Sequence, residues 1–343
     1  MKKILDKLKT ILWVNPDLTF SAKIHSSMFH QILPKFFAYE RFDNVAAAVQ
    51  TLTEDLLCEW VDMAIKKTNI ADIICTGGVF MNVKANQKLA ELPSVKSFYV
   101  FPSCGDESTA FGAAYYGYIM KSKQDILPIK PLEQLYLGGE FSDEDIKEQI
   151  NKSKGKNFKV KFTRNIENEI ASLLAEGKIV ARFAGRMEWG ARALGNRSIL
   201  AHPSRQELVY KINDQIKSRD FWMPFAPSIL DRDFAKYLKI KKKMAAPYMA
   251  ITFDSTDKGK ENFKAAMHPY DFTIRPHIVY KDWNPSYYKL IEEFKRLTGI
   301  GGILNTSFNL HGYPIVYTPE DALYVFENSN LRHLAIGSFL VSK

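Results

Sequence analysis

The chain has 343 residues, of which 46% are hydrophobic and 25% charged, a composition typical of folded globular domains that excludes a disordered or fibrous protein. Its formal net charge of +9 favours anionic ligands or partners. The net charge does not indicate whether such a ligand is a nucleic acid, a nucleotide or a phosphate. No apolar run reaches the roughly 18 residues that a membrane-spanning helix needs, so we expect neither a membrane span nor a signal peptide.

The cysteines bear on the cellular compartment. Cys58, Cys75 and Cys104 are odd in number, widely spaced and outside any CxxC pair. This pattern argues against a disulfide framework and against a structural zinc site, and we expect a cytoplasmic location.

Residues 1–123 are predicted to form an α/β layer. The stretch before Asp43 has no clear hydrophobic period, but apolar residues then recur at helical spacing up to Met63, with Asp43 as the expected N-cap. A strand at Ile70–Cys75, a helix through Asn86 to Leu92, a strand at Ser97–Phe101 and a helix rich in small residues around Ala110–Ala114 are expected to follow. This alternation is typical of α/β proteins.

A linker and a second α/β domain are predicted beyond this layer. Residues 124–134 carry two prolines and no period, which is typical of a linker. In residues 135–343, strands are predicted at Phe158–Thr163, Ile179–Phe183, Ser198–Ala201, Tyr248–Phe253, Ile274–Tyr280, Gly302–Leu304 and Ala335–Val341. Helices are predicted at Ser142–Ile150, Glu167–Ala175, Arg205–Ile216, Ser286–Leu297 and Pro319–Phe326.

The run from Gly185 to Ser198 is the most distinctive segment of the second domain. Arg186, Arg192 and Arg197 alternate there with three glycines, an asparagine and a serine. Glycine lets backbone N–H groups come close to a ligand, and the planar guanidinium of arginine matches carboxylate and phosphate oxygens. The run therefore predicts the wall of an anion-binding pocket.

Other cations and short polar side chains of the second domain fit the same pocket. Lys217 and Arg219 stand one residue apart, before aromatic residues and prolines that favour a rigid loop, and Arg275 falls on a predicted strand. Asn305–Ser307 offers hydrogen-bonding groups, although such residues are also common in ordinary turns. Because no nucleophile and base accompany them, the expected chemistry is positioning and charge neutralisation of a phosphate-bearing substrate.

Two turns of the first domain are ambiguous by themselves. Gly77 and Gly78 follow a strand and precede a helix, so they form either a structural turn or a site for the phosphate or sugar of a nucleotide. Asp106 also lies between a strand and a helix, where it is either a plain N-cap or a carboxylate that binds a ligand or metal.

Several motifs in register resemble the O-carbamoyltransferase family of nodulation protein U and the antibiotic carbamoyltransferases. The resemblance runs from about Phe37 to the C-terminus. The motifs that carry it are Gly77–Asn86, Pro102–Ser108, Gly185–Ser198, Lys217–Pro227, Asn305–Asn309, Thr318–Ala322 and Ile336–Val341. One departure is Ala191, where many members of the family have proline.

The resemblance implies an α/β fold in two parts. Residues 1–123 would be the second half of an actin/Hsp70-type (Kae1-like) domain, and residues 135–343 would be a YrdC-like domain. In the family, the YrdC-like domain forms carbamoyl-adenylate from carbamoyl phosphate and ATP. The Kae1-like domain then transfers the carbamoyl group to an acceptor hydroxyl, near a bound divalent metal that is iron in the family.

The resemblance also implies roles for individual residues. The catalytic residues would be Arg186, Lys217, Arg219 and Arg275, and Arg192, Arg197, Asn305, Thr306 and Ser307 would line the same YrdC-like pocket. Gly77, Gly78 and Asn82 would contact nucleotide in the Kae1-like site, and Asp106 would be the metal ligand.

The sequence lacks the family's metal-binding histidine pair and its acceptor-binding residues, which belong to the first half of the Kae1-like domain. We therefore expect a carbamoyltransferase that forms carbamoyl-adenylate and needs a partner chain for transfer to a sugar or small-molecule hydroxyl. An alternative is a YrdC-like nucleotide- or RNA-binding module without transferase activity, although RNA is disfavoured because the basic residues cluster with glycines rather than with aromatic platforms. A second alternative is an inert fragment that associates through exposed apolar surface.

Overall fold

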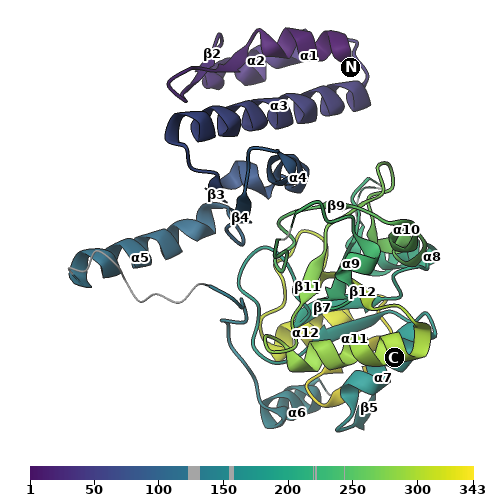
Figure 1. Cartoon of the computed structure of the whole chain (residues 1–343). Helices are drawn as coiled ribbons and strands as arrows, with labels where there is room; N and C mark the ends of the chain where they lie inside the picture. The colour runs from purple at the N-terminus through teal and green to yellow at the C-terminus, as the bar shows by residue number, and fades with distance from the viewer. Residues whose placement is uncertain (123–131, 154–157, 219, 221, 243) are drawn as a thin grey trace. The chain divides into compact units, whose positions relative to one another are not determined.

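The computed structural model describes residues 1–122, 132–153, 158–218, 220, 222–242 and 244–343. The chain divides into two compact units (Figure 1). Unit 1 comprises Met1–Cys104 and Lys241–Met244, and unit 2 comprises Gly105–Ile240 and Ala245–Lys343. Most of the predicted linker, residues 124–131, lies outside the described residues. Among those that are described, no helix is both long and apolar enough to cross a bilayer.

Unit 1 is organised around the long helix α3 (Phe42–Thr68), along which the N-terminal elements lie (Figure 1). These elements are α1 (Lys2–Lys9), the antiparallel strands β1 (Leu12–Val14) and β2 (Phe20–Ala22), the 3-10 helix η1 (Ser26–Met28) and α2 (Phe29–Phe36). Their shared core contains Ile4, Leu8, Leu52 and Leu56. Elements this short carry little periodic signal, which explains why the sequence pattern before α3 is unclear.

The prediction that Asp43 caps α3 is wrong. The helix begins at Phe42, and Arg41 occupies the N-cap position. Asp43 lies in the first turn, where its carboxylate pairs with Arg41 at 2.7 Å and stabilises the positive end of the helix dipole.

The remainder of unit 1 is a β-α-β arrangement. The parallel strands β3 (Asp72–Cys75) and β4 (Ser97–Val100) are joined through the 3-10 helix η2 (Gly78–Met81) and α4 (Val83–Glu91). Within the same unit, Lys241 pairs with Glu91 at 2.6 Å, and Lys242 donates to the carbonyls that follow α4. These two lysines thereby complement the negative end of the α4 dipole.

Unit 2 contains an eight-stranded mixed sheet in the order β11-β8-β12-β7-β6-β13-β14-β5. Two pairs, β11–β8 and β13–β6, are parallel and the others are antiparallel, so the predicted α/β class is confirmed as a mixed α/β fold. The strands are β5 (Lys159–Phe162), β6 (Val180–Phe183), β7 (Arg197–Ala201), β8 (Ala226–Leu230), β11 (His277–Val279), β12 (Gly302–Ser307), β13 (His333–Ile336) and β14 (Phe339–Ser342). A separate small pair is formed by β9 (Phe253–Asp254) and β10 (Thr273–Ile274).

Helices complete the described part of unit 2, and several of them pack on this sheet (Figure 1). They are η3 (Asp106–Ser108), α5 (Thr109–Ser122), α6 (Asp143–Lys152), α7 (Ile166–Ala175), α8 (Glu207–Ile212), the π-helix η4 (Asn213–Lys217), α9 (Phe234–Tyr237), α10 (Asp257–Asn262), η5 (Lys264–Ala266), α11 (Pro285–Thr298) and α12 (Pro319–Glu327). Helix α11 packs on α7, and α12 packs on α6. Both α6 and α12 begin with a complete capping box, which explains why their starts are predictable from the sequence.

Four predicted elements differ from the structure. The strand expected at Tyr248–Phe253 is reduced to β9, and the one expected at Ile274–Tyr280 is broken into β10 and β11. The break falls at Pro276, which has no N–H to donate. The strand expected at Ala335–Val341 is the hairpin β13–β14, which turns at Gly337 (φ +53°). The helix expected at Arg205–Ile216 is α8 followed by η4.

Candidate functional site

A small polar cavity of unit 2 brings together predicted site residues from several segments. It has a volume of about 100 Å³ and contains Arg192, Arg275 and the β12 residues Asn305–Ser307. The segment Pro224–Ala226 completes the wall at the start of β8. Since β12 is hydrogen-bonded to both β7 and β8, the sheet itself holds these groups together. The cavity has room for a phosphate-sized group with two arginines at its wall.

The loop that carries Arg192 is held by Glu188, a residue that the sequence analysis missed. Glu188 is buried, and its Oε1 accepts hydrogen bonds from the N–H groups of Leu194 at 2.5 Å, Asn196 at 3.2 Å and Arg197 at 3.3 Å. Its Oε2 atom is buried and has no hydrogen-bond partner among the described residues. The only acidic residue of the Gly185–Ser198 run therefore shapes the backbone on which Arg192 sits.

The three arginines of this run occupy three different environments. Arg192 lines the cavity, whereas Arg186 is exposed and donates to the carbonyls of Leu137 at 2.8 Å and Gly138 at 2.9 Å. Arg197 is buried, and burial lowers the pKa of its guanidinium to about 10.

Arg197 contributes to the fold of the run itself. It donates to the carbonyl of Ala184 at 2.9 Å, and its guanidinium lies 3.7 Å from the centre of the Phe183 ring. Neither Arg186 nor Arg197 is among the residues that line the cavity.

Lys217 lies directly behind the cavity wall. It is buried at the end of η4, and its Nζ donates to Ser307 Oγ at 3.1 Å and to Asn309 Oδ1 at 2.5 Å. Ser307 in turn donates to Asn309 Oδ1 at 2.7 Å, so the ammonium group is linked to the cavity through a short polar chain. Arg219 lies outside the described residues.

Asn305 is fixed by a buried network that the sequence analysis did not predict. Its Nδ2 donates to the carbonyl of Ala193 at 2.9 Å and to Ser228 Oγ at 3.0 Å, and Ser228 Oγ lies 3.0 Å from His277 Nδ1. Burial lowers the pKa of His277 to about 3, so its imidazole is neutral at physiological pH. Because these contacts use Nδ2, the Oδ1 atom of Asn305 is left as a buried acceptor without a partner in the described part of the chain.

The predicted nucleotide contacts of unit 1 lie in the turn after β3. Gly77 has a φ of +104°, and a Cβ at Gly77 or Gly78 would meet no described atom within 4 Å. Asn82 caps α4 by accepting from the N–H of Ala85, and its amide forms two hydrogen bonds with Gln50 of α3, at 2.9 and 3.1 Å. Asn82 therefore joins α4 to α3, whether or not it also contacts a ligand.

The residues described in the structure do not fit a metal site at Asp106. This aspartate is exposed at the start of η3, and no group of three or more His, Cys, Asp or Glu side chains in the described ranges could hold a metal ion. A single carboxylate falls short of the several protein ligands that divalent metals usually take.

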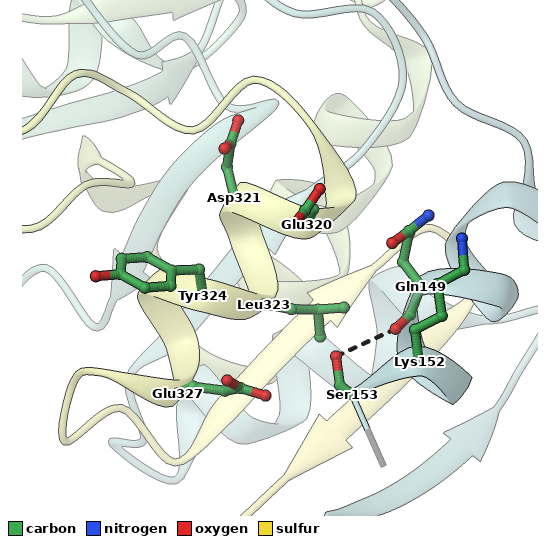
Figure 2. A pocket seen from close by; sticks show the side chains of 8 residues that line it. All are labelled: Gln149, Lys152, Ser153, Glu320, Asp321, Leu323, Tyr324 and Glu327. Carbon is green, nitrogen blue, oxygen red and sulfur yellow. Dashed lines mark hydrogen bonds between the residues drawn. The ribbon is translucent and has the colours of Figure 1, made fainter.

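A different cavity, of about 460 Å³, lies between α6 and α12 (Figure 2). Glu320, Asp321 and Glu327 project from α12, opposite Gln149 and Lys152 of α6. It contains none of the predicted site residues, and its acidic character does not suit a phosphate-bearing substrate.

The fold and the polar cavity define a mixed α/β protein with an arginine-lined pocket, and comparisons with known families assign its class. A family model described as carbamoyltransferase C-terminus matches residues 171–343, and one described as carbamoyltransferase N-terminus matches residues 6–115. The first alone covers half of the chain, and the chain therefore belongs to the carbamoyltransferase family.

The chain is also similar to individual proteins, one of which is named as a carbamoyltransferase. The chain is 37% identical to the uncharacterized protein MJ1058 of Methanocaldococcus jannaschii, over 95% of this chain and 53% of that protein. It is 32% identical to nodulation protein NolO of Bradyrhizobium diazoefficiens, over 88% of this chain and 54% of that protein. It is 26% identical to the 3'-hydroxymethylcephem-O-carbamoyltransferase of Amycolatopsis lactamdurans, over 86% of this chain and 53% of that protein.

The chain spans about half the length of the curated relatives it matches. Among solved structures, full-length HypF in the phosphate- and nucleotide-bound form matches 50% of this chain and 24% of that chain. The sequence identity is 22% and the TM-score is 0.36, which is too low to equate the two folds.

Proposed function

We propose that this chain catalyses the activation step of an O-carbamoyltransferase: it forms carbamoyl-adenylate from carbamoyl phosphate and ATP. In this proposal residues 135–343 are the YrdC-like domain that carries the reaction, and residues 1–123 correspond to the second half of a Kae1-like domain. The observation that supports it is the cavity that unites Arg192, Arg275 and Asn305–Ser307 in a member of the carbamoyltransferase family.

The proposed reaction has two steps, hydrolysis of carbamoyl phosphate and adenylation of the resulting carbamate. Water cleaves carbamoyl phosphate to carbamate and inorganic phosphate, and a carbamate oxygen then attacks the α-phosphorus of ATP. The bond from this phosphorus to the bridging oxygen breaks, and pyrophosphate leaves. One carbamoyl phosphate, one ATP and one water thus give carbamoyl-adenylate, phosphate and pyrophosphate.

The residues of the cavity suit this reaction because it brings several negatively charged groups together. Arg192 and Arg275 would offset their mutual repulsion, and Lys217 would add positive charge through Ser307. Fixed cations in a site that excludes water stabilise developing charge more strongly than they do in solution. Carbamoyl phosphate is small enough for a cavity of about 100 Å³, whereas a whole nucleotide is not.

A release assay tests this proposal. The protein is incubated with carbamoyl phosphate and ATP, and both phosphate and pyrophosphate are measured. Arg275→Ala should reduce pyrophosphate release by about a hundredfold or more, the typical cost of removing one group that stabilises transition-state charge. Arg296→Ala, which removes an exposed arginine of α11 that pairs with Glu293, is the matched control and should leave the rate unchanged.

Two results would contradict the proposal. One is the absence of pyrophosphate from well-folded protein, and the other is an Arg275→Ala rate equal to that of wild type. RNA binding that weakens steeply with salt, without pyrophosphate release, would instead favour a nucleotide- or RNA-binding module.

Transfer of the carbamoyl group is a further part of the proposal. The acceptor would be a hydroxyl of a sugar or small molecule. The chain spans about half the length of the relatives named above, and we propose that transfer also uses the other half of the Kae1-like domain, which would complete a metal site near Asp106. Adding a polypeptide that contains this half, together with an acceptor, should then convert carbamoyl-adenylate to a carbamate ester and AMP.

A further inference from the structure

The arginine-rich run has an irregular backbone and depends on other segments for its position. Residues 184–196 are all described, and none of them belongs to a helix or a strand. Because such a loop has no hydrogen-bond ladder of its own, its backbone groups are paired with neighbouring segments. Arg192, which lines the polar cavity, therefore owes its place to residues that lie outside the cavity.

One neighbouring segment of the run is residues 135–139, which we call the clamp segment. Three backbone hydrogen bonds join it to the run. They connect Gly138 N–H to the Met187 carbonyl at 2.9 Å, Met187 N–H to the Gly139 carbonyl at 3.0 Å, and Trp189 N–H to the Leu135 carbonyl at 2.7 Å. The clamp segment therefore lies along the first part of the run.

The side chain of Arg186 adds two further bonds to the clamp segment. Its Nη2 donates to the carbonyl of Leu137 at 2.8 Å, and its Nε donates to the carbonyl of Gly138 at 2.9 Å. The backbone carbonyl of Arg186 is fixed as well, because it accepts from Asn196 Nδ2 at 2.8 Å. Two donors of this exposed guanidinium are thus used on neutral acceptors of the protein itself.

Tyr136 attaches the clamp segment to the other end of the run. It is buried, and its hydroxyl donates to the carbonyl of Leu194 at 2.9 Å. Leu194 follows Arg192 by two residues and Trp189 precedes it by three, so the clamp segment holds the run on both sides of Arg192. Tyr136 also packs in one buried cluster with Met249, which lines the polar cavity.

We propose that Arg186 is a positioning residue: its bonds to the clamp segment, together with that of Tyr136, hold Arg192 in place to bind an anion in the polar cavity. This inference rests on the proposed function, because that function supplies the phosphate-bearing substrate. It gives Arg186 a role that needs no contact with the substrate. A loop that is already held in its binding position binds more tightly, since none of the binding free energy goes into ordering it.

Binding of inorganic phosphate tests this inference without relying on turnover. The full chain is titrated by calorimetry. Tyr136→Phe, which keeps the ring and removes one donor, should weaken phosphate binding about fivefold, the equivalent of one hydrogen bond, and Arg186→Ala should weaken it at least as much. Tyr288→Phe is the matched control, because it removes the hydroxyl of another buried tyrosine, on α11, that donates to Asp231 at 3.1 Å. This control should bind phosphate as wild type does.

A double-mutant cycle shows whether Arg186 acts through the clamp segment. A Cβ at Gly138 would lie 2.9 Å from the Cβ of Met187, so Gly138→Ala separates the clamp segment from the run while Arg186 stays unchanged. Arg186→Ala combined with Gly138→Ala should lose less affinity than the product of the two single losses, since either change releases the same clamp. The loss in Arg186→Ala should also be similar at low and at high salt, because its acceptors are uncharged. Tyr136→Phe replaces Gly138→Ala in the cycle if the latter does not fold.

The outcomes separate this inference from the proposed function. Wild-type phosphate affinity in Tyr136→Phe would overturn the inference, and so would single losses that multiply in the double variant, the result expected if Arg186 contacts the anion directly. If the variants behave as expected but no pyrophosphate is released, the clamp stands and the proposed reaction is wrong. If pyrophosphate is released while every clamp variant keeps the wild-type affinity for phosphate, the reaction stands and the clamp is wrong.

Discussion

At the scale of single residues, the carboxylate of Glu188 organises the arginine-rich run. One of its oxygens accepts hydrogen bonds from the N–H groups of Leu194 and Asn196 in the loop before β7, and from the N–H group of Arg197 at the start of β7. The same loop carries Arg192 into the polar cavity and presents the Ala193 carbonyl that fixes Asn305. A buried carboxylate with three donors is therefore a positioning group for the cavity, although it does not line the cavity itself.

Glu188→Ala is expected to lower both stability and affinity. It leaves three buried N–H groups without their acceptor, so the free energy of unfolding should fall by about 3 kcal/mol or more, measured by urea denaturation. Affinity for carbamoyl phosphate, measured by calorimetry, should fall because Arg192 is no longer held. Glu188→Gln keeps a carbonyl acceptor and should recover most of the affinity.

A variant of Asp321 controls for general destabilisation. Asp321→Ala removes the capping box of α12, remote in sequence from the loop, and should lower stability without weakening carbamoyl phosphate binding. If Glu188→Ala binds carbamoyl phosphate as tightly as Asp321→Ala does, Glu188 has no positioning role.

Burial of His277 is expected to make the free energy of unfolding depend on pH. Burial lowers its pKa to about 3 in the folded state, against about 6.5 when unfolded, so between these values the unfolded state binds more protons. The free energy of unfolding should therefore fall as the pH drops from about 6 to 4, with a contribution from His277 approaching about 1.4 kcal/mol per pH unit. Urea denaturation at several pH values measures this slope, and His277→Asn should make it shallower. An unchanged slope in this variant would contradict the assignment.

At the scale of elements, the arginine-rich loop depends on a backbone conformation that only glycine adopts easily. Gly195 has a φ of +110°, and a Cβ there would lie 2.4 Å from a ring carbon of Tyr287 on α11. Gly299, at the end of α11, also has a positive φ of +77°, but a Cβ there would meet no described atom within 4 Å. Comparing alanine substitutions at the two glycines therefore distinguishes the free-energy cost of backbone strain from the additional cost of a steric clash.

Alanine at these two glycines should have unequal effects. Gly299→Ala introduces only the left-handed strain and should cost about 1 kcal/mol. Gly195→Ala adds the clash with Tyr287 and should cost at least about 2 kcal/mol more, together with a loss of carbamoyl phosphate affinity. Thermal and urea denaturation of both variants measure the difference. Equal costs would show that the loop relaxes around the new methyl group.

At the scale of the whole molecule, the sequence predicts the buried sheet better than its surroundings. Strands β6, β7 and β12 were expected within a few residues of their actual bounds, because each contains short apolar stretches, such as Ile199–Ala201 in β7 and Ile303–Leu304 in β12, that are typical of buried strands. Strand β8 was missed, since Pro224 and Pro227 indicated a rigid loop, yet Pro227 lies within this strand opposite Leu304.

The composition of the candidate site was predictable in part from the sequence, but its geometry was not, and the roles of its residues stay predictions. Arg192, Arg275 and Asn305–Ser307 were expected to share a pocket, and they do line one cavity. The sequence does not show that Arg186 and Arg197 diverge from it, because their directions depend on the path of the loop around Glu188. It also gives no sign of the Asn305–Ser228–His277 network, whose members are far apart in the chain and meet only through the pairing of β8, β11 and β12.

Strand β5 closes one edge of the eight-stranded sheet, and its sequence affects how copies of the protein meet. Val160 and Phe162 are 46% and 56% exposed there, which by themselves would invite a strand from another molecule to extend the sheet. Lys159 and Lys161 alternate with them along the strand. Lys161 also pairs with Glu169 of α7 at 2.7 Å. Pairing this edge with the same edge of a second copy would bring these charged side chains close together, and charged residues on an edge strand disfavour such edge-to-edge aggregation.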